Sequence, residues 1–304
     1  MSCLCLGEAK GMIRYMRYEG IVYRPPSEAY SLIIQVSVGC AHNKCTFCNM
    51  YKSKKFRIKS LEEIYGDLYE ARQMYGHVER IFLADGDSLV LPMKKLTQIL
   101  IKIKELFPKC RRVSAYATPR DILIKSPEEL KELKELGIGI FYMGIESGSD
   151  LILKDIQKGV TSSEIIEAGQ KIKKSGIKLS VTFISGIGGK DKWQENARES
   201  ARVITAINPD YVGLLTLMVE HGTKMYDDIN NGEFKLLSPE EIMLETRELV
   251  KNIHTSNCIF RSNHASNYVA LSGTLSEDRE RLIALIDDVL SGKYGYKPEK
   301  FRRL

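Results

Sequence analysis

The sequence predicts an α/β protein in which a mainly parallel β-sheet is covered by α-helices. Six short apolar runs alternate strictly with six longer amphipathic runs, an order typical of strand–helix units with a parallel sheet. The expected strands are residues 32–38, 80–84, 112–117, 140–145, 178–184 and 211–217. The expected helices are residues 61–75, 93–107, 127–136, 162–175, 194–207 and 239–252. Six units are too few for a closed eight-stranded barrel, so a doubly wound sheet and an open partial barrel both fit the pattern.

The expected helices begin and end at residues that favour these positions. Ser126 and Pro127 precede two glutamates, which places a capping hydroxyl, a first-turn proline and negative charge at the positive end of a helix. Ser238 and Pro239 repeat this arrangement before the last expected helix. Gly137 follows an expected helix, at a position where glycine favours termination.

Polar and glycine-rich residues follow every expected strand. These stretches are residues 40–48, 85–88, 118–120, 144–148, 185–189 and 220–222. Because parallel strands end at one edge of a sheet, and barrel enzymes gather their chemistry at that edge, we expect these stretches to meet. A structural protein does not need this coincidence, so the pattern predicts a binding or catalytic site.

The first of these stretches carries three cysteines, Cys40, Cys45 and Cys48, in the run GCAHNKCTFC. Three thiolates at this spacing can bind three irons of an iron–sulfur cluster and leave one iron open for a substrate or a second cofactor. The alternative is a zinc site with His42 as the fourth ligand, in a binding module without redox chemistry. Zinc sites usually divide their ligands into two pairs with a longer spacer, so the spacing favours the cluster.

Size and composition narrow the class of protein. The chain has 304 residues, of which 43% are hydrophobic and 28% are charged, as in ordinary globular proteins. The seven cysteines are an odd number, and three of them are clustered, which indicates a reducing compartment rather than a disulfide framework. The first residues do not have the order of a secretory signal, and the apolar runs are too short to span a membrane. We therefore expect a cytoplasmic protein without a membrane partner.

The net charge of +6 includes a basic run at residues 52–59, just after the cysteines. This run is expected to be either a solvated loop or a surface for an anionic substrate or an acidic electron donor such as a flavodoxin or ferredoxin. The sequence does not show the combined basic and aromatic pattern of a dedicated nucleic-acid binder. A small-molecule substrate is therefore favoured over nucleic acid.

Several motifs resemble those of the radical S-adenosylmethionine (SAM) superfamily. The superfamily signature is CxxxCxxC; this chain has CxxxxCxxC, with Phe47 matching the aromatic residue usual before the last cysteine. Gly86 and Asp87 resemble the end of a glycine-glycine-glutamate motif whose first glycine is replaced here. GIESGSD, which contains Glu146, and KGVT at residues 158–161 resemble a subgroup that includes coproporphyrinogen dehydrogenases, methylthiotransferases and Elongator acetyltransferase-like enzymes.

The resemblance implies a partial (β/α)6 barrel over residues 30–255. Residues 1–29 would form an N-terminal extension, and residues 256–304 would form a C-terminal loop and helix that close the barrel. The implied protein is an oxygen-sensitive enzyme with two cofactors, a 4Fe-4S cluster and SAM. The cluster ligands would be Cys40, Cys45 and Cys48.

The resemblance also implies SAM contacts at the strand ends. The expected contacts are Phe47, Gly86, Asp87, Arg120, Glu146, Ser147, Ile187, Arg198 and Leu215. In this interpretation the backbone at Gly86 binds the amino group, Glu146 meets the ribose or methionine portion, and Ile187 lies against adenine. Arg120 and Arg198 are the candidates for the SAM carboxylate.

The expected reaction is reductive cleavage of SAM to a 5′-deoxyadenosyl radical, which abstracts hydrogen from a substrate that the sequence does not identify. On the substrate side we expect His264 and Arg261, within a polar block at residues 261–267, and Cys258 as a hydrogen-atom donor. A hydrogen-bonded loop that closes the barrel is the alternative role of this block. The alternative reactions within the family are methyl or other group transfer and modification of RNA or a tetrapyrrole.

Overall fold

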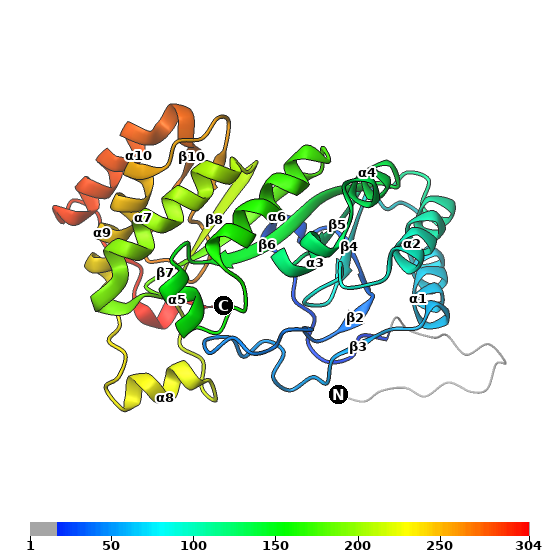
Figure 1. Ribbon diagram of the computed structural model, residues 1–304, viewed down its shortest axis with the longest axis horizontal. Helices are drawn as coiled ribbons and strands as arrows, with labels where there is room; N and C mark the ends of the chain where they lie inside the picture. Colours follow the sequence, from blue (N-terminus) through cyan, green and yellow to red (C-terminus); the bar gives the residue numbers. More distant parts are fainter. Residues whose placement is uncertain (1–16, 304) are drawn as a thin grey trace, which may run out of the picture.

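The computed structural model describes residues 17–303, and its centre is one eight-stranded sheet with the order β1-β4-β5-β6-β7-β8-β9-β10. The strands are β1 (Leu32–Gln35), β4 (Arg80–Ala84), β5 (Arg112–Tyr116), β6 (Ile138–Glu146), β7 (Lys178–Ser185), β8 (Tyr211–Thr216), β9 (Ile259–Arg261) and β10 (Ser272–Thr274). Neighbours from β1 to β9 pair in parallel, and β10 pairs with β9 in antiparallel orientation. The sheet is open at β1 and β10, which confirms the predicted α/β partial barrel (Figure 1).

Helices cover one face of this sheet, from α1 and α2 at one end to α9 and α10 at the other (Figure 1). They are α1 (Leu61–Met74), α2 (Met93–Leu106), α3 (Pro119–Ile124), α4 (Pro127–Glu135), α5 (Asp150–Asp155), α6 (Ser162–Lys174), α7 (Gly189–Ile207), α8 (Lys224–Asn230), α9 (Pro239–Asn252) and α10 (Leu275–Leu290), with 3₁₀ helices η1 (Pro26–Glu28) and η2 (Glu299–Phe301). The main hydrophobic core lies between helices and sheet and contains alternate strand residues such as Ile81 and Leu83. Within residues 17–303, none of the helices has both the length and the apolar character required to cross a membrane.

The sequence pattern differs from the structure in two places. The run expected as one strand, residues 32–38, divides into β1 and β2 (Ser37–Val38), because the chain leaves the sheet to pair with β3 (Arg57–Ile58). Residues 256–304, expected as a separate extension, contribute β9 and β10 to the same sheet. Each of these strands has three residues, too few to show a period of two in the sequence.

The other face of the sheet carries a smaller apolar cluster around Phe82 and Tyr142. Residues near the start of the described chain cover this cluster, and Glu28 of η1 fixes them there. Glu28 is fully buried and accepts hydrogen bonds from the Tyr142 hydroxyl at 2.6 Å and from Arg112 Nη2 at 2.7 Å. Ser31 donates a further hydrogen bond to the same carboxylate. The contacts close the end of the sheet opposite to the cysteines.

Substituting Glu28 by alanine should lower the free energy of unfolding by about 2 kcal/mol, because it leaves a half-buried arginine and a buried tyrosine hydroxyl without their acceptor. Urea unfolding of the anaerobically prepared protein measures this loss. E28Q is the matched control, since it keeps an acceptor oxygen, and it should lose less. An E28A variant within about 0.5 kcal/mol of the unsubstituted protein would show that this contact does not fix the segment.

Candidate cluster and cofactor site

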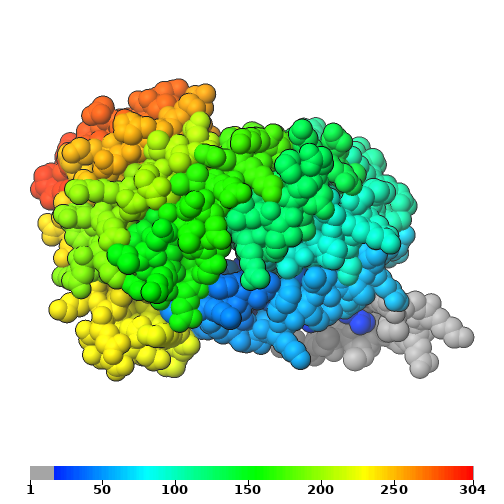
Figure 2. All heavy atoms as spheres, in the orientation of Figure 1, coloured from blue at the N-terminus to red at the C-terminus, as the bar shows by residue number. Residues whose placement is uncertain are grey.

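The three clustered cysteines lie in the loop between β2 and β3 (residues 39–56, the cysteine loop). Cys40, Cys45 and Cys48 are free thiols and half-buried. Figure 2 shows this segment in blue, against green residues near position 150 and beside the yellow helix α8. The loop therefore lies at the sheet edge where the parallel strands end, as the sequence predicted.

Backbone hydrogen bonds attach the cysteine loop to three neighbouring segments. The amide of Gly86, directly after β4, donates to the Gly39 carbonyl at 3.2 Å. The amide of Thr46 donates at 3.0 Å to the carbonyl of Ile156, which follows α5, and the Thr46 carbonyl accepts from the amide of Met225 in α8 at 3.0 Å. The residues between the cysteines are thus held on both sides, which fixes the direction of the thiols.

Close packing at two glycines completes this attachment. A Cβ atom on Gly86 would lie 3.1 Å from the Cβ of Cys40. A Cβ atom on Gly159 would lie 2.7 Å from Cε1 of His42. The His42 ring lies there because its Nε2 is 2.7 Å from the carbonyl oxygen of Gln157. His42 therefore anchors the cysteine loop on the turn between α5 and α6.

An ion pair lies beside the thiols. Lys158 Nζ is 2.9 Å from Oε1 of Glu146, and their side chains are only 14% and 13% exposed. Burial raises the pKa of Cys45 to about 11; the positive charge of Lys158 opposes this rise and the negative charge of Glu146 adds to it. Burial also raises the pKa of Cys48. Lys158 therefore favours the thiolate form of Cys45, which is the form that metal ligation requires.

Asp87 places a buried carboxyl group next to Gly86. It is 1% exposed, and its carboxylate oxygens make no well-aligned hydrogen bond among residues 17–303; the Asp121 carboxyl and the backbone amides of Leu89 and Val90 lie close by. Burial raises the pKa of Asp87 well above its usual range, and the nearby Asp121 carboxyl raises it further. Buried polar groups are rarely left unpartnered, so this carboxyl is available for a polar group of a ligand.

These residues fit a 4Fe-4S cluster with SAM beside it. Three free thiols can supply one ligand to each of three irons, and Gly86 allows close approach of the backbone. In the part of the chain that the structure describes, no three His, Cys, Asp or Glu side chains converge closely enough to hold a single metal ion. A zinc ion requires such convergence, whereas a cluster places each thiolate on a different iron.

Comparison with known protein families assigns the chain to one of them. The Radical SAM superfamily matches residues 34–201, which is more than half of the chain and includes all three clustered cysteines. The chain belongs to the radical SAM superfamily. This membership makes it a radical SAM enzyme with a 4Fe-4S cluster and SAM as cofactors. The zinc-stabilised binding module considered from the sequence is set aside.

This radical SAM enzyme spans only about half of the length of the known proteins that it resembles, or less. An uncharacterised methyltransferase of Pyrococcus horikoshii is 29% identical over 197 residues, which cover 64% of this chain and 41% of the relative. The methyltransferase TsrM of Kitasatospora setae has a TM-score of 0.54 at 17% identity, over 66% of this chain and 39% of its own. The coproporphyrinogen III oxidase HemN of Escherichia coli has a TM-score of 0.53 at 16% identity, over 73% of this chain and 52% of its own. These structural likenesses show the shared fold alone.

Several predicted SAM contacts lie at strand ends, but most of their side chains are already packed or hydrogen-bonded within the protein. Phe47 packs partly buried against the main core, and Ile187 is 1% exposed within it, so Ile187 can reach a ligand only through its backbone. Ser147 is buried and donates a hydrogen bond to Asn196 Oδ1 at 2.6 Å. Leu215 is half-buried near the end of β8, where its side chain can line a ligand.

Two other predicted residues, Arg198 and Cys258, do not join this group, whereas Arg120 follows β5 at the same edge of the sheet. Arg120 is exposed at the start of α3. Arg198 is 62% exposed and pairs with Glu248 across the outer helices α7 and α9. Cys258 is fully buried in the core between sheet and helices, the wrong face for a hydrogen-atom donor. Sequence spacing missed this because Cys258 precedes a three-residue strand that the sequence did not reveal.

The polar block on the substrate side lies beyond β8. Arg261 is exposed at the end of β9. His264 Nδ1 accepts the Ser266 amide at 3.1 Å, so in the neutral ring Nε2 carries the proton. Burial lowers the pKa of His264, and the positive charge of Lys297 lowers it further. Asn267 fastens the block to β8 through hydrogen bonds of 2.7 and 2.9 Å, which supports the loop-closing role for part of the block.

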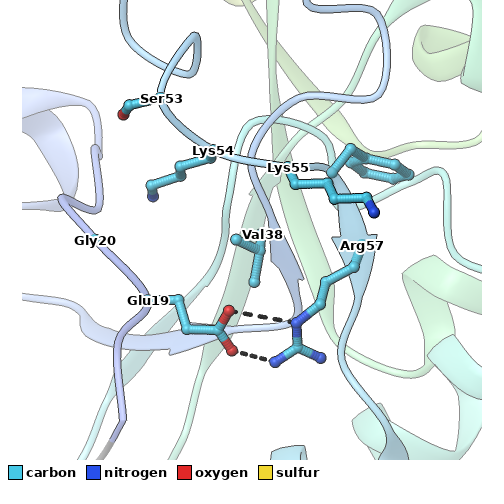
Figure 3. A pocket seen from close by; sticks show the side chains of 8 residues that line it. Glu19, Gly20, Val38, Ser53, Lys54, Lys55 and Arg57 are labelled. Carbon is cyan, nitrogen blue, oxygen red and sulfur yellow. Dashed lines mark hydrogen bonds and ion pairs between the residues drawn. The ribbon is translucent and has the colours of Figure 1, made fainter.

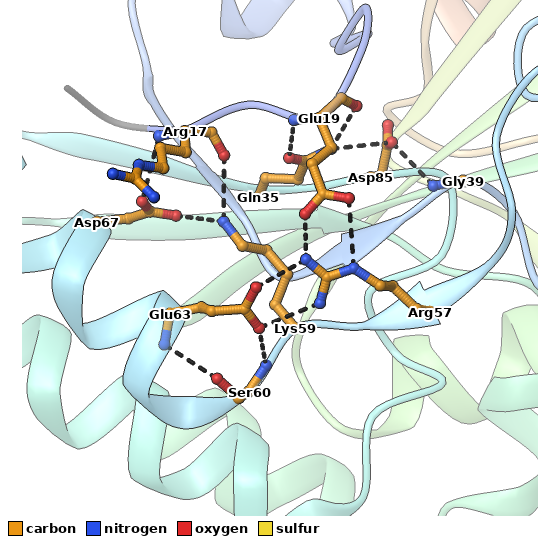
Figure 4. Close-up of polar contacts among 10 residues, drawn as sticks. All are labelled: Arg17, Glu19, Gln35, Gly39, Arg57, Lys59, Ser60, Glu63, Asp67 and Asp85. Carbon is orange, nitrogen blue, oxygen red and sulfur yellow. Dashed lines mark hydrogen bonds and ion pairs between the residues drawn. The ribbon is translucent and has the colours of Figure 1, made fainter. Parts of the chain in front are cut away.

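Most of the positive charge in the basic run at residues 52–59 is paired with carboxylates. One pair is Lys54–Asp85. The others are Arg57–Glu19, Arg57–Glu63 and Lys59–Asp67 (Figure 4). A cleft of about 600 Å³ beside the run is lined by Glu19, Gly20, Val38 and residues 53–57 (Figure 3). Lys55 is exposed there. Because three of the five cations pair with carboxylates of this chain, the run mainly joins the segment after the cysteines to Asp85, Glu19 and α1, and little of its charge is left for an anionic partner.

A buried carboxyl group supports the loop after β7. Glu245 of α9 is 2% exposed and accepts hydrogen bonds from the Gly186 amide at 2.6 Å, from Asn196 Nδ2 at 2.8 Å and from the Ser185 hydroxyl. Burial raises the pKa of Glu245 to about 7. The Asn196 side chain also binds Ser147, so one network connects the ends of β6 and β7.

Replacing Gly159 by alanine should weaken cluster retention. Gly159 has φ +77° and its new Cβ would meet the His42 ring at 2.7 Å, whereas Gly176 has φ +78° with nothing within 4 Å. The two substitutions share the backbone strain, so their difference isolates the contact with His42. After anaerobic reconstitution, G159A should hold fewer irons per chain than G176A. Equal iron contents would contradict the anchoring role of His42.

The stability of the protein should fall with rising pH because of Glu245. Its pKa is about 7 when folded and 4.5 ordinarily, so its contribution is complete below about pH 4.5 and is lost as pH rises through 7. Between about pH 5.5 and about pH 8 the loss should be about 2 kcal/mol. Urea unfolding at both pH values should show this loss in the unsubstituted protein and not in E245Q. Parallel pH dependences in the two proteins would contradict the assignment.

Proposed function

We propose that Cys40, Cys45 and Cys48 bind three irons of the 4Fe-4S cluster and that SAM occupies the fourth. Reductive cleavage of SAM then gives methionine and a 5′-deoxyadenosyl radical, which takes a hydrogen atom from a small-molecule substrate. The observation that supports this most strongly is the meeting of three free thiols, Gly86 and the Glu146–Lys158 pair at one sheet edge.

The chain's own residues have distinct roles in this proposal. The backbone at Gly86 and the Asp87 carboxyl bind the amino-acid portion of SAM, because Asp87 has unused hydrogen-bonding capacity. Glu146 binds the ribose, and Leu215 with the backbone of Ile187 lines the adenine. Phe47, Arg120 and Ser147 are kept as outer contacts of the same site. Arg198 is left out because it pairs with Glu248 on the outer helices.

The cluster supplies, when bound, the single electron that cleaves SAM, and a flavodoxin or ferredoxin is the proposed source of that electron. Arg261 and the neutral His264 form the proposed substrate side, where an arginine can pair with an anionic group and a histidine can exchange a proton. The protein holds the reactants in position and excludes water from the radical.

Methyl transfer is the second candidate reaction. Two of the relatives, one from Pyrococcus horikoshii and TsrM from Kitasatospora setae, are named methyltransferases. In that reaction SAM loses its methyl group and leaves S-adenosylhomocysteine, whereas hydrogen abstraction leaves 5′-deoxyadenosine. Chromatography of the nucleoside products therefore separates the two candidates.

Alanine at any of the three clustered cysteines should abolish cleavage of SAM. The anaerobically reconstituted enzyme should hold about four irons per chain and form 5′-deoxyadenosine with dithionite and SAM. C110A is the matched control, because Cys110 is also a half-buried free thiol but lies outside the cysteine loop, and it should retain iron and activity. Formation of 5′-deoxyadenosine by a variant lacking all three clustered cysteines would refute the proposed ligation.

A further inference from the structure

Resting on the proposed function, we infer that Lys158 is a positioning residue that holds a fixed positive charge between the cluster ligands and Glu146. Its two roles are to stabilise the reduced cluster and to orient the carboxylate that meets SAM. The sequence placed Lys158 in the KGVT run but gave it no role. The structure brings it to the site from a separate turn.

The backbone that carries Lys158 is fixed on the cysteine loop. The Lys158 amide donates to the Leu153 carbonyl at 2.9 Å, which closes the end of α5. The preceding residue, Gln157, has φ +54°, and its carbonyl lies 2.7 Å from His42 Nε2. Because the turn and the cysteine loop are attached to each other, the Lys158 side chain starts from a fixed position beside the thiols.

The ammonium group and Glu146 fill a small space near the end of β6. A Cβ atom on Gly144 would lie 2.2 Å from Oε1 of Glu146 and 3.4 Å from Nζ of Lys158, so only glycine leaves room for the pair. The pairing register of β6 and β7 shifts between Gly144 and Glu146, and Glu146 has φ +59°. Such a bulge redirects a side chain, and here it turns Glu146 toward Lys158.

The charge of Lys158 acts on the cluster ligands. Lys158 lies beside the thiols because both of its chain neighbours meet His42, which stands between Cys40 and Cys45: the Gln157 carbonyl is 2.7 Å from His42 Nε2, and a Cβ on Gly159 would lie 2.7 Å from His42 Cε1. With the lysine side chain 14% exposed, water screens this interaction less than on an open surface. A reduced cluster carries one more negative charge than an oxidised one. The ammonium group therefore favours reduction, and the carboxylate of Glu146 opposes it.

The midpoint potential of the reconstituted enzyme without SAM tests the electrostatic role, by redox titration followed with electron paramagnetic resonance. K158M should lower the equilibrium constant for reduction at least tenfold, which is a shift of about 59 mV to lower potential for one electron. E146Q should shift the potential upward, because it removes a negative charge. K158R should stay near the unsubstituted enzyme. K154M is the matched control, since Lys154 is exposed in the same segment, and it should not shift the potential.

The affinity for SAM tests the orienting role in the same variants. By equilibrium binding under anaerobic conditions, K158M should bind SAM at least tenfold more weakly, and K158R should recover most of the loss. A K158M potential equal to that of K154M would overturn the inference. If K158M does not assemble a cluster, the midpoint potential of E146Q is the deciding measurement. An E146Q potential that is not higher than that of the unsubstituted enzyme overturns the inference. Failure of the unsubstituted enzyme to assemble a cluster would instead refute the proposed function.

Discussion

The attachment of the cysteine loop to the ends of β4 and α5 is the constraint on which the site depends. A loop with three thiols and no regular structure is mobile unless its backbone is bound elsewhere, and here the amides of Gly86 and Thr46 supply that binding. The parallel order of the sheet makes this geometry available, because successive strands end at one edge. The same packing requires glycine at positions 86 and 159, where a side chain would meet Cys40 or His42.

Two lysines, one in the cysteine loop and one beside it, offset the effects of burying the loop's thiols and the neighbouring Asp85. Thiols removed from water resist ionisation, so a site that needs thiolates benefits from a nearby cation, and Lys158 is that cation. On the other side of the loop, Lys54 reaches Asp85 at 2.6 Å, which joins the basic run to the end of β4. Lys54 thus holds the loop in place through its ion pair, whereas Lys158 acts through its charge on the thiols.

Much of the fold could be predicted from the sequence, because long strands and capped helices carry strong local patterns. The six main strands and the cysteine site came from periodicity and from cysteine spacing. The short strands β9 and β10 did not, since three residues hold no period, and with them the burial of Cys258 was missed. Lys158 was missed for another reason: its link to Cys45 depends on two loops meeting in space, which spacing along the chain does not encode. Arg198 was misplaced because an arginine on an outer helix looks the same in sequence as one facing a ligand.

We expect the three thiols to leave one iron of the cluster without a protein ligand, so that SAM can bind it. Mössbauer spectroscopy of enzyme reconstituted with ⁵⁷Fe, recorded with and without SAM, tests this most directly. SAM should change the isomer shift of about a quarter of the iron, the one site that the cysteines do not bind. A spectrum in which SAM leaves every iron of an assembled cluster unchanged would contradict this expectation.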